Sequence, residues 1–339
     1  MRARAWMKGK GSCVLTVSLL LSLLSWPAQS ASANNTTFSG EATVVQATVV
    51  GLPPIVLSDT GALDSTGGAR EASLLDANIP GLLTAEVLHA STVGQGQRSS
   101  SEASVANVTL TVGGNTISAG LLRARATAEC HNGTASVSGS SEIVDLVVNG
   151  QAVVVSGQPN QTISLPVGRV IINEQQSSVS GNTGDITVNA LHVVVDGVAD
   201  VIISSAHADI TCGGPVCPGG DFVTGGGWIT GTPSGAKGTF GVAGGIKNGA
   251  LWGHLTYIDH GTNMKVKGTG VTAYTVTGPT TRHIEGTAEI DGRSGSYQVD
   301  VSDNGEPGRK DTFSIMLSNR YSASGLLIGG NIQLHQPCK

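Results

Sequence analysis

Apolar and polar residues alternate in short runs along most of the chain, with turn-forming residues between the runs. Tyr297–Val301 and Phe313–Leu317 each place every second, apolar side chain on one face. The segment between them, residues 303–311, contains Gly, Pro, Asp and Asn, which favour turns. A period of two is typical of half-buried β-strands, so we predict that these two strands form an antiparallel hairpin.

The segment before residue 214 shows the same alternation in a less regular form. Thr109–Val112 alternates cleanly, whereas the strand-forming runs Gly40–Val50 and Glu142–Val155 are irregularly spaced. Ala103–Cys130 and Ile186–Cys212 share a Val-rich run, a Gly or Asp turn and an Ala-x-Ala before the cysteine. Because a solenoid needs repeats of fixed period, we predict an antiparallel β-sandwich or β-roll here. The fold class expected for the whole chain is all-β.

Composition changes abruptly near residue 216. Residues 34–216 contain one aromatic residue, no lysine, and five Arg against fifteen Asp and Glu, a net charge of −10. Residues 217–339 contain nine aromatic residues and have a net charge of +1. The Gly- and Pro-rich segment at this change is typical of a linker. We predict a sandwich or roll domain at residues 34–213, a linker at 214–220, and a smaller antiparallel β domain at 221–339.

Residues 1–33 have the features of a secretory signal peptide. Arg2, Arg4, Lys8 and Lys10 precede a short apolar run, Val14–Leu24, and small-x-small sites follow it. The run is shorter than the roughly 20 residues of a spanning helix, which makes an uncleaved anchor the weaker alternative. We therefore expect cleavage near Ala33, no later membrane span, and a secreted protein that is extracellular or associated with the cell wall.

Four cysteines, Cys130, Cys212, Cys217 and Cys338, remain after the predicted signal peptide. In an oxidising compartment they allow three disulfide connectivities, among which the sequence does not decide. Cys217 and Cys338 bracket the C-terminal segment, and the other two end strand-like runs. We favour the pairing of Cys130 with Cys212 and of Cys217 with Cys338. The main alternative joins Cys212 to Cys217 and Cys130 to Cys338, and a zinc site is weaker because no Cys-x-x-Cys spacing occurs.

Several long phrases in the chain resemble known protein sequences. Ser39–Val45, Arg70–Leu75 and Ser180–Val188 resemble the choice-of-anchor P family of secreted, mostly actinobacterial proteins. Phe222–Ile229, Gly253–His260 and Asp303–Gly308 resemble the domain that often follows it. The resemblance implies a secreted or cell-surface β protein and implies no particular reaction. The chain shows none of the surface-attachment signals to which the family name refers, so the mode of attachment stays open.

The 303–311 segment also offers ligands for a metal ion. Asp303, Asn304, Glu306 and Asp311 lie within nine positions, and oxygen atoms of a flexible loop are the ligands that Ca²⁺ prefers. The spacing differs from that of an EF-hand, and an ordinary acidic hairpin loop is the favoured alternative. Ca²⁺ is the one cofactor that the sequence suggests, and a calcium-stabilised structural protein is one candidate function.

His254, Asp259 and His260 lie near the end of an expected strand. Imidazole and carboxylate groups at this spacing can bind a transition metal or form a general-base pair. Alternation places His254 on one face with Thr256 and Ile258, so we favour surface hydrogen bonding as the role of these groups.

The aromatic residues of the second segment are candidates for glycan binding, because sugar rings stack on exposed aromatic faces. Core packing is the favoured role of most of them, since a domain of this size must bury large side chains. Trp228 and Trp252 each lie beside a glycine, and we expect them to be more exposed and to contact ligand. The Gly225–Gly227 run either lets a ligand approach the backbone or allows tight sheet packing.

Familiar catalytic motifs are missing from the sequence, among them Gly-x-Ser-x-Gly, His-Glu-x-x-His and the Walker loop. The net charge of −5 argues against nucleic acid as the main partner. We predict a non-catalytic extracellular or cell-envelope protein with a structural or binding role, whose partner is a cell-wall or extracellular polysaccharide. A secreted glycan hydrolase is the alternative, because the separation of paired carboxylates depends on the three-dimensional structure.

Overall fold

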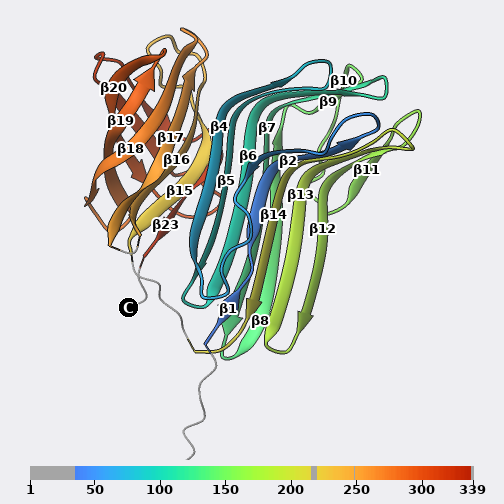
Figure 1. Ribbon diagram of the computed structural model, residues 1–339, viewed down its shortest axis with the longest axis horizontal. Helices are drawn as coiled ribbons and strands as arrows, with labels where there is room; N and C mark the ends of the chain where they lie inside the picture. Colours follow the sequence, from blue (N-terminus) through green and yellow to red (C-terminus); the bar gives the residue numbers. More distant parts are fainter. Residues whose placement is uncertain (1–34, 215–219, 248, 337–339) are drawn as a thin grey trace, which may run out of the picture. The chain divides into compact units, whose positions relative to one another are not determined.

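The computed structural model describes residues 35–214, 220–247 and 249–336, which form antiparallel β-sheets (Figure 1). In these ranges we find no helix with the length and hydrophobicity needed to span a membrane. The all-β, antiparallel fold class predicted from the alternation is confirmed. Residues 34–339 form one compact unit. The predicted signal peptide and most of the predicted linker lie outside the described residues, and the division into two domains stays a prediction.

Two seven-stranded sheets come from residues 37–211. Sheet one consists of β1 (Thr37–Phe38), β2 (Glu41–Val49), β3 (Ile55–Asp59), β11 (Gln161–Ser164), β12 (Arg169–Ser180), β13 (Thr183–Val195) and β14 (Ala199–Thr211). Sheet two consists of β4 (Gly68–Ile79), β5 (Leu83–Gln95), β6 (Arg98–Val112), β7 (Asn115–His131), β8 (Thr134–Val144), β9 (Val147–Val148) and β10 (Gln151–Ala152). The spatial orders are β11-β12-β13-β14-β2-β3, with β1 on β14, and β10-β9-β7-β6-β5-β4, with β8 on β7.

Sheets one and two face each other across a core of small aliphatic side chains. Val44 and Val188 of sheet one and Leu88 and Leu122 of sheet two are fully buried in it. Phe38 is the single aromatic member of this core among the described residues. β-Branched and small side chains pack closely on pleated surfaces, which is why a Val- and Ala-rich sequence builds this sandwich.

The long strands of the sandwich change the phase of their alternation part-way along. On β14, Val201 and Ile203 are buried on one side of the change, and Ala206 and Ala208 are buried on the other. Ser204 lies between them with a φ of 58°, and it is missing from the pairing with both neighbouring strands. Ser204 acts as one extra residue in the strand and shifts the alternation by one position. Odd-numbered residues therefore point into the core before Ser204, and even-numbered residues point into the same core after it.

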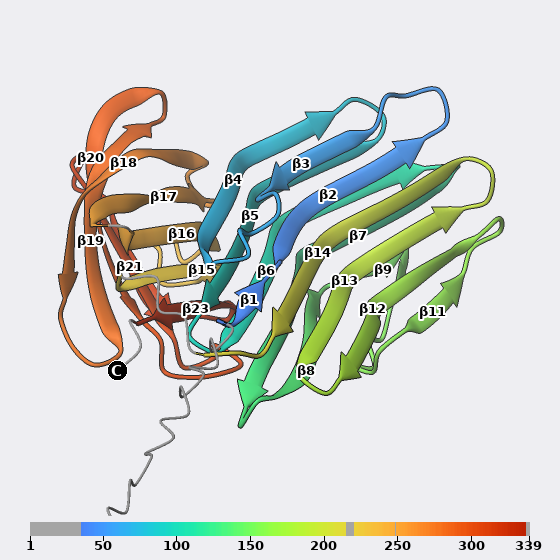
Figure 2. The same cartoon turned by 60° about the horizontal axis from the view of Figure 1, so that its bottom comes forward.

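The same interruption crosses both sheets as a row of residues with positive φ. In sheet one the row contains Asn173 and Ser58, with φ values of 53° and 48°. In sheet two it contains Val87 and Asn107, with φ values of 46° and 45°, and Asp145, directly after β8, has a φ of 54°. Figure 2 shows the long strands bending rather than running straight. The irregular spacing of apolar residues in this part of the sequence is therefore a property of the sheets.

Sheet three contains nine strands from residues 222–335. They are β15 (Phe222–Ile229), β16 (Gly238–Lys247), β17 (Ala250–Asp259), β18 (Met264–Val276), β19 (Thr281–Ile290), β20 (Arg293–Ser302), β21 (Thr312–Leu317), β22 (Ser322–Leu326) and β23 (Gly329–His335). Each strand pairs with the next from β15 to β22, and β23 returns to pair with β15. The predicted hairpin is confirmed, because β20 pairs with β21 and buries its alternate apolar residues.

Sheet three curls around its own core, which contains aromatic side chains. The rings of Phe240 and Phe313 stack with their centroids 3.9 Å apart, and Tyr257 lies beside them at 6.1 Å from Phe313. Most of the aromatic residues of the second segment therefore pack in or against buried clusters, as the core interpretation predicts.

The structure contains the predicted Cys130–Cys212 disulfide. It joins the end of β7 in sheet two to the residue after β14 in sheet one. This bond excludes the alternative in which Cys130 pairs with Cys338. Cys217 and Cys338 lie outside the described residues, and their pairing stays a prediction.

Candidate functional site

The outer face of sheet two, which points away from the sandwich core, is polar and charged. Ser100 and Glu102 of β6 and Arg123 and Arg125 of β7 lie on it, because alternate residues of a strand point to opposite faces. Strands β15, β16, β17 and β23 of sheet three contact this side of sheet two (Figure 1). We call this interface the junction.

Glycines allow sheet three to approach sheet two closely at the junction. A Cβ atom on Gly226 would lie 2.7 Å from Oγ of Ser104, and one on Gly241 would lie 3.1 Å from Cβ of His89. Both distances are shorter than ordinary van der Waals contacts, so a side chain at either position would push the sheets apart. Packing against sheet two therefore explains Gly226, whereas a Cβ on Gly225 or Gly227 would meet the backbone of the paired strand β23.

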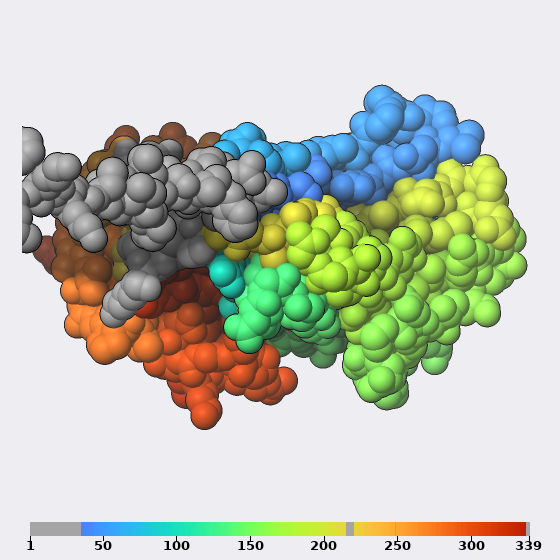
Figure 3. All heavy atoms as spheres, turned by 90° about the horizontal axis from the view of Figure 1, so that it is seen from below, coloured from blue at the N-terminus to red at the C-terminus, as the bar shows by residue number. Residues whose placement is uncertain are grey.

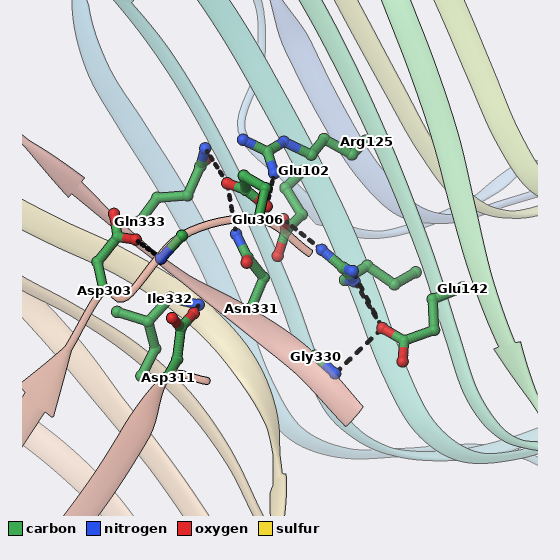
Figure 4. Close-up of polar contacts among 12 residues, drawn as sticks. Glu102, Arg125, Glu142, Asp303, Glu306, Asp311, Gly330, Asn331, Ile332 and Gln333 are labelled. Atoms are coloured by element: carbon green, nitrogen blue, oxygen red, sulfur yellow. Dashed lines mark hydrogen bonds and ion pairs between the residues drawn. The ribbon is translucent and has the colours of Figure 1, made fainter. Parts of the chain in front are cut away.

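Arg123 forms the most buried ionic contacts of the junction. Its Nη1 lies 3.1 Å from Oε2 of Glu102, and its Nη2 lies 3.0 Å from Oε2 of Glu142. Burial alone would lower the pKa of Arg123, but these two carboxylates more than offset that effect and raise it. The same Glu142 oxygen accepts a hydrogen bond of 3.1 Å from the backbone N–H of Gly330 in β23 (Figure 4). The ion pairs of sheet two thus extend to sheet three.

The two tryptophans expected to contact ligand lie at the junction, where lysines cover them. Nζ of Lys237 lies 4.8 Å from the ring centroid of Trp228 and donates to the carbonyl oxygen of Gly120 in sheet two. Lys247 lies 5.3 Å from the ring centroid of Trp252 and also donates to a carbonyl of sheet two. Both tryptophans are half-buried. Their observed contacts are cation–π and packing contacts within the protein.

A polar groove opens at the junction, beside the loop between β20 and β21. Its first hollow has a volume of about 270 Å³, and the lining includes Arg98, Ser100, Asp303, Glu306, Gln333 and His335. A second hollow of about 260 Å³ is lined by residues that include Arg125, Glu129, Ser138 and Ser140. Arg98 and Glu306 line both hollows, so the two adjoin. We call the pair of hollows the Arg98 groove.

Residues distant in sequence meet in this groove. Figure 3 shows the red surface of the C-terminal strands beside the cyan-green surface of sheet two. Arg98 and Arg125 come from β6 and β7, whereas Asp303 and Glu306 come from the β20–β21 loop. The structure therefore brings half of the predicted metal residues to a pair of arginines.

Glu306 lies at the centre of the groove's hydrogen bonds (Figure 4). It forms an ion pair with Arg125, and its Oε1 accepts hydrogen bonds from Nδ2 of Asn331 at 3.3 Å and Nε2 of Gln333 at 3.4 Å. Burial alone would raise the pKa of Glu306, but the hydrogen bond and charge of Arg125 outweigh it and lower the pKa. Glu306 is therefore held as a carboxylate.

His335 lines the first hollow, where the positive charges of Arg98 and Arg125 act on its imidazole ring. Burial lowers the pKa of His335 to about 3, and the charges of Arg98 and Arg125 contribute to this shift. Its ring stacks on Phe222 with centroids 4.7 Å apart, and its Nε2 lies 3.0 Å from Oγ1 of Thr224. The imidazole is thus neutral at physiological pH and forms a wall of the hollow.

The predicted metal ligands are used in contacts within the protein. Oδ2 of Asp303 accepts a hydrogen bond of 2.8 Å from the N–H of Leu334. Asp311 is fully buried and accepts hydrogen bonds from the N–H groups of Asn304 at 2.8 Å and Ile332 at 2.9 Å. Burial raises the pKa of Asp311 to about 6. Within the described ranges, no group of three or more His, Cys, Asp or Glu side chains is placed to hold a metal ion.

Removal of metal ions is expected to leave the protein's stability unchanged. Asp303, Glu306 and Asp311 all bind groups of β23, so the loop is held by direct hydrogen bonds. Differential scanning fluorimetry with excess EDTA, with and without added CaCl₂, tests this expectation. A melting temperature that falls with EDTA and recovers with Ca²⁺ would contradict this expectation and show that the protein binds calcium.

The His254, Asp259 and His260 group does not converge on one point as a ligand set. Asp259 is fully buried and accepts hydrogen bonds from the OH of Tyr321 at 2.9 Å and the N–H of Gly261 at 2.8 Å. Nδ1 of His260 lies 3.5 Å from Oε2 of Glu86 in sheet two. Asp259 and His260 form hydrogen bonds, as favoured from the sequence, but Asp259 does so inside the protein and His260 does so at the junction.

Arg98, Ser100 and Arg125 were not found as site residues from the sequence. One signal was present, because three of the five arginines in the segment 34–216 lie at Arg98, Arg123 and Arg125. Such a concentration of cations in an acidic segment indicates local charge pairing. Arg125 lies in β7 and its partner Glu306 lies in the β20–β21 loop, far away in the chain, so only the tertiary structure reveals their contact.

Comparisons with known proteins assign no family to the chain. No protein-family profile matches the sequence, and no curated protein matches it. One solved structure, of a Nitrosomonas europaea protein provisionally named AttH, is similar over 89% of this chain and 93% of that chain. The sequence identity is 6% and the TM-score is 0.20.

Proposed function

We propose that this protein is a non-catalytic, extracellular binding protein of the cell envelope that holds a glycan in the Arg98 groove. The observation that carries the proposal is the pair of adjoining polar hollows that share Arg98 and Glu306. Two hollows in succession suit a ligand made of successive units, such as the sugars of a polysaccharide.

The chemistry of the groove supports a hydroxyl-rich ligand. Gln333 offers an amide, Ser138 and Ser140 offer hydroxyls, and Arg98 offers a guanidinium. Such groups donate and accept hydrogen bonds in the directions that sugar hydroxyls require. With both tryptophans half-buried and capped by lysines, the proposed recognition relies on these polar groups.

The state of Glu306 favours binding over hydrolysis. A glycoside hydrolase needs one carboxyl group with a raised pKa to protonate the leaving oxygen. The pKa of Glu306 is lowered by Arg125, so this residue does not supply that proton. Asp311 has a raised pKa, but it is fully buried and does not line the groove. A secreted glycan hydrolase is therefore the weaker proposal, and turnover of a glycan by the purified protein would favour it instead.

The extracellular location rests on sequence features. Residues 1–33 resemble a signal peptide. Three segments, Ser39–Val45, Arg70–Leu75 and Ser180–Val188, resemble choice-of-anchor P proteins. The Cys130–Cys212 disulfide supports an oxidising compartment, since such bonds persist mainly outside the cytosol. Detection of the mature protein in the culture supernatant or the cell-wall fraction tests this part of the proposal.

A pull-down with insoluble cell-wall polysaccharides tests glycan binding. We expect retention of the purified protein, and a loss of about tenfold in affinity for Ser138→Trp, because the indole fills the second hollow. Ser138 is exposed, so the substitution leaves the core intact. Ser178→Trp, at an exposed position of β12, is the matched control and should bind normally. Failure of the unmodified protein to bind any polysaccharide, or equal binding by the Ser138→Trp variant, would refute the proposal.

A further inference from the structure

We propose that the Arg98 groove recognises an acidic sugar, and that Arg98 binds the carboxylate of a uronic-acid unit. This inference rests on the proposed glycan-binding function and specifies its substrate class. The ligand is identified by the groups that the groove leaves without partners.

Arg98 has binding capacity that the protein itself does not use. Its Nε lies 3.3 Å from Oε1 of Glu129, and its side chain is 45% exposed. Within the described part of the chain, no hydrogen bond from its two terminal nitrogens is found. A planar guanidinium can bind a carboxylate through two parallel hydrogen bonds, which gives both affinity and a defined orientation.

The acidic groups of the groove already have partners. Glu306 is bound by Arg125, Asn331 and Gln333, and the oxygens of Asp303 accept backbone N–H groups of Leu334 and Gly305. Burial, followed by the like charge of Arg125, lowers the pKa of Arg98, whereas the carboxylates of Glu129, Glu306 and Asp303 act in the opposite direction and only partly offset this. An anionic ligand would relieve this repulsion between the two arginines.

Ser100 provides a second contact beside Arg98. It lies two residues further along β6, so both side chains point to the same face about 7 Å apart. Ser100 is only 5% exposed, and its buried Oγ has no hydrogen-bond partner among the described residues. A buried hydroxyl without a partner is destabilising, and a ligand hydroxyl in the first hollow would satisfy it. A uronic-acid ring carries a carboxylate for Arg98 and hydroxyls for Ser100 on the same sugar unit.

The size of each hollow limits the ligand to about one sugar unit. The volumes of about 270 and 260 Å³ lie below the roughly 300–1,000 Å³ of pockets that hold drug-sized molecules. The acidic unit therefore occupies the first hollow, and the next unit of a chain occupies the second. A free uronic acid offers the same carboxylate but has no neighbouring sugar unit to occupy the second hollow.

Isothermal titration calorimetry with galacturonic acid and galactose tests the inference, since these sugars differ only at C6. We expect the purified protein to bind galacturonic acid at least tenfold more tightly than galactose. Arg98→Gln should reduce this ratio to near one, and Arg98→Lys should give an intermediate ratio. Arg70→Gln is the matched control, because Arg70 is an exposed arginine of sheet two outside the groove, and it should keep the full ratio.

Titration with oligogalacturonate distinguishes the two sources of the carboxylate. Tighter binding of the oligomer than of the monomer would support a polysaccharide that fills both hollows, and equal binding would support the free acid. Equal affinity for galactose and galacturonic acid, or an acid preference that survives Arg98→Gln, would overturn the inference and leave glycan binding intact. An absence of binding to every glycan tested would overturn the inference and the proposed function together.

Discussion

Replacement of Arg123 by alanine is expected to lower the free energy of unfolding by about 5 kcal/mol, the upper part of the range for breaking a buried ion pair. The side chain of Arg123 is 7% exposed and contacts two carboxylates, Glu102 and Glu142. Glu102 is itself buried, so the substitution leaves a negative charge in the interior without its partner. Urea unfolding at pH 7, followed by circular dichroism, measures the loss.

The pH dependence of this loss provides an internal check. In the Arg123→Ala variant the buried carboxylate of Glu102 has no cation beside it, and an unpaired charge of this kind is costly to bury. Protonation removes that charge, so the difference from the unmodified protein should shrink at acidic pH. Arg70→Ala is the control, because its ion pair with Asp64 is exposed and is worth about 1 kcal/mol or less. A loss below about 1 kcal/mol for Arg123→Ala would show that the contacts at the junction are unimportant for stability.

Removal of the Cys130–Cys212 disulfide, by replacing both residues with alanine, is expected to lower the free energy of unfolding by about 4.5 kcal/mol. The bond spans 82 positions of the sequence. Cross-links stabilise mainly because they restrict the unfolded chain, and the effect grows slowly with loop length. The bond also connects the two sheets that share the aliphatic core, so its loss affects the whole sandwich.

Urea unfolding with and without a reductant tests the second prediction. The unmodified protein should lose stability when the disulfide is reduced. The double variant lacks this disulfide, so the reductant should not lower its stability by this route. Ser136→Ala/Ser178→Ala, at exposed positions, controls for the number of substitutions and should change the stability little. A loss below about 2 kcal/mol in the double variant would contradict the chain-entropy argument.

The strands with simple alternation could be predicted from the sequence. Tyr297–Val301 and Phe313–Leu317 pair as expected because each residue's burial follows its position in a pleated strand. The β14 strand could not be predicted in this way. Ser204 adopts a positive φ that its residue type does not favour, and it reverses the alternation after it. The neighbouring strands impose this conformation, so no local pattern reveals it.

The candidate site was predicted in part. The 303–311 loop was recognised as chemically unusual, and its acidic residues do line or support the Arg98 groove. Their partners were missed, because Arg98 and Arg125 look like ordinary polar positions of strands until sheet three lies against them. Trp228 and Trp252 show the reverse case. They were expected to be exposed and to contact ligand, but lysines cover them at the junction.

Local sequence patterns were sufficient for the all-β class and the hairpin at residues 297–317, and they favoured the pairing of Cys130 with Cys212 that the structure contains. These features depend on alternation, on turn residues and on where cysteines lie relative to strands. Three features required the folded chain: the phase change across the sandwich, the close contact of glycine backbones with sheet two, and the meeting of Arg125 with Glu306. Each of these arises from contacts between residues far apart in the chain, whose energies depend on the packed sheets rather than on neighbouring residues.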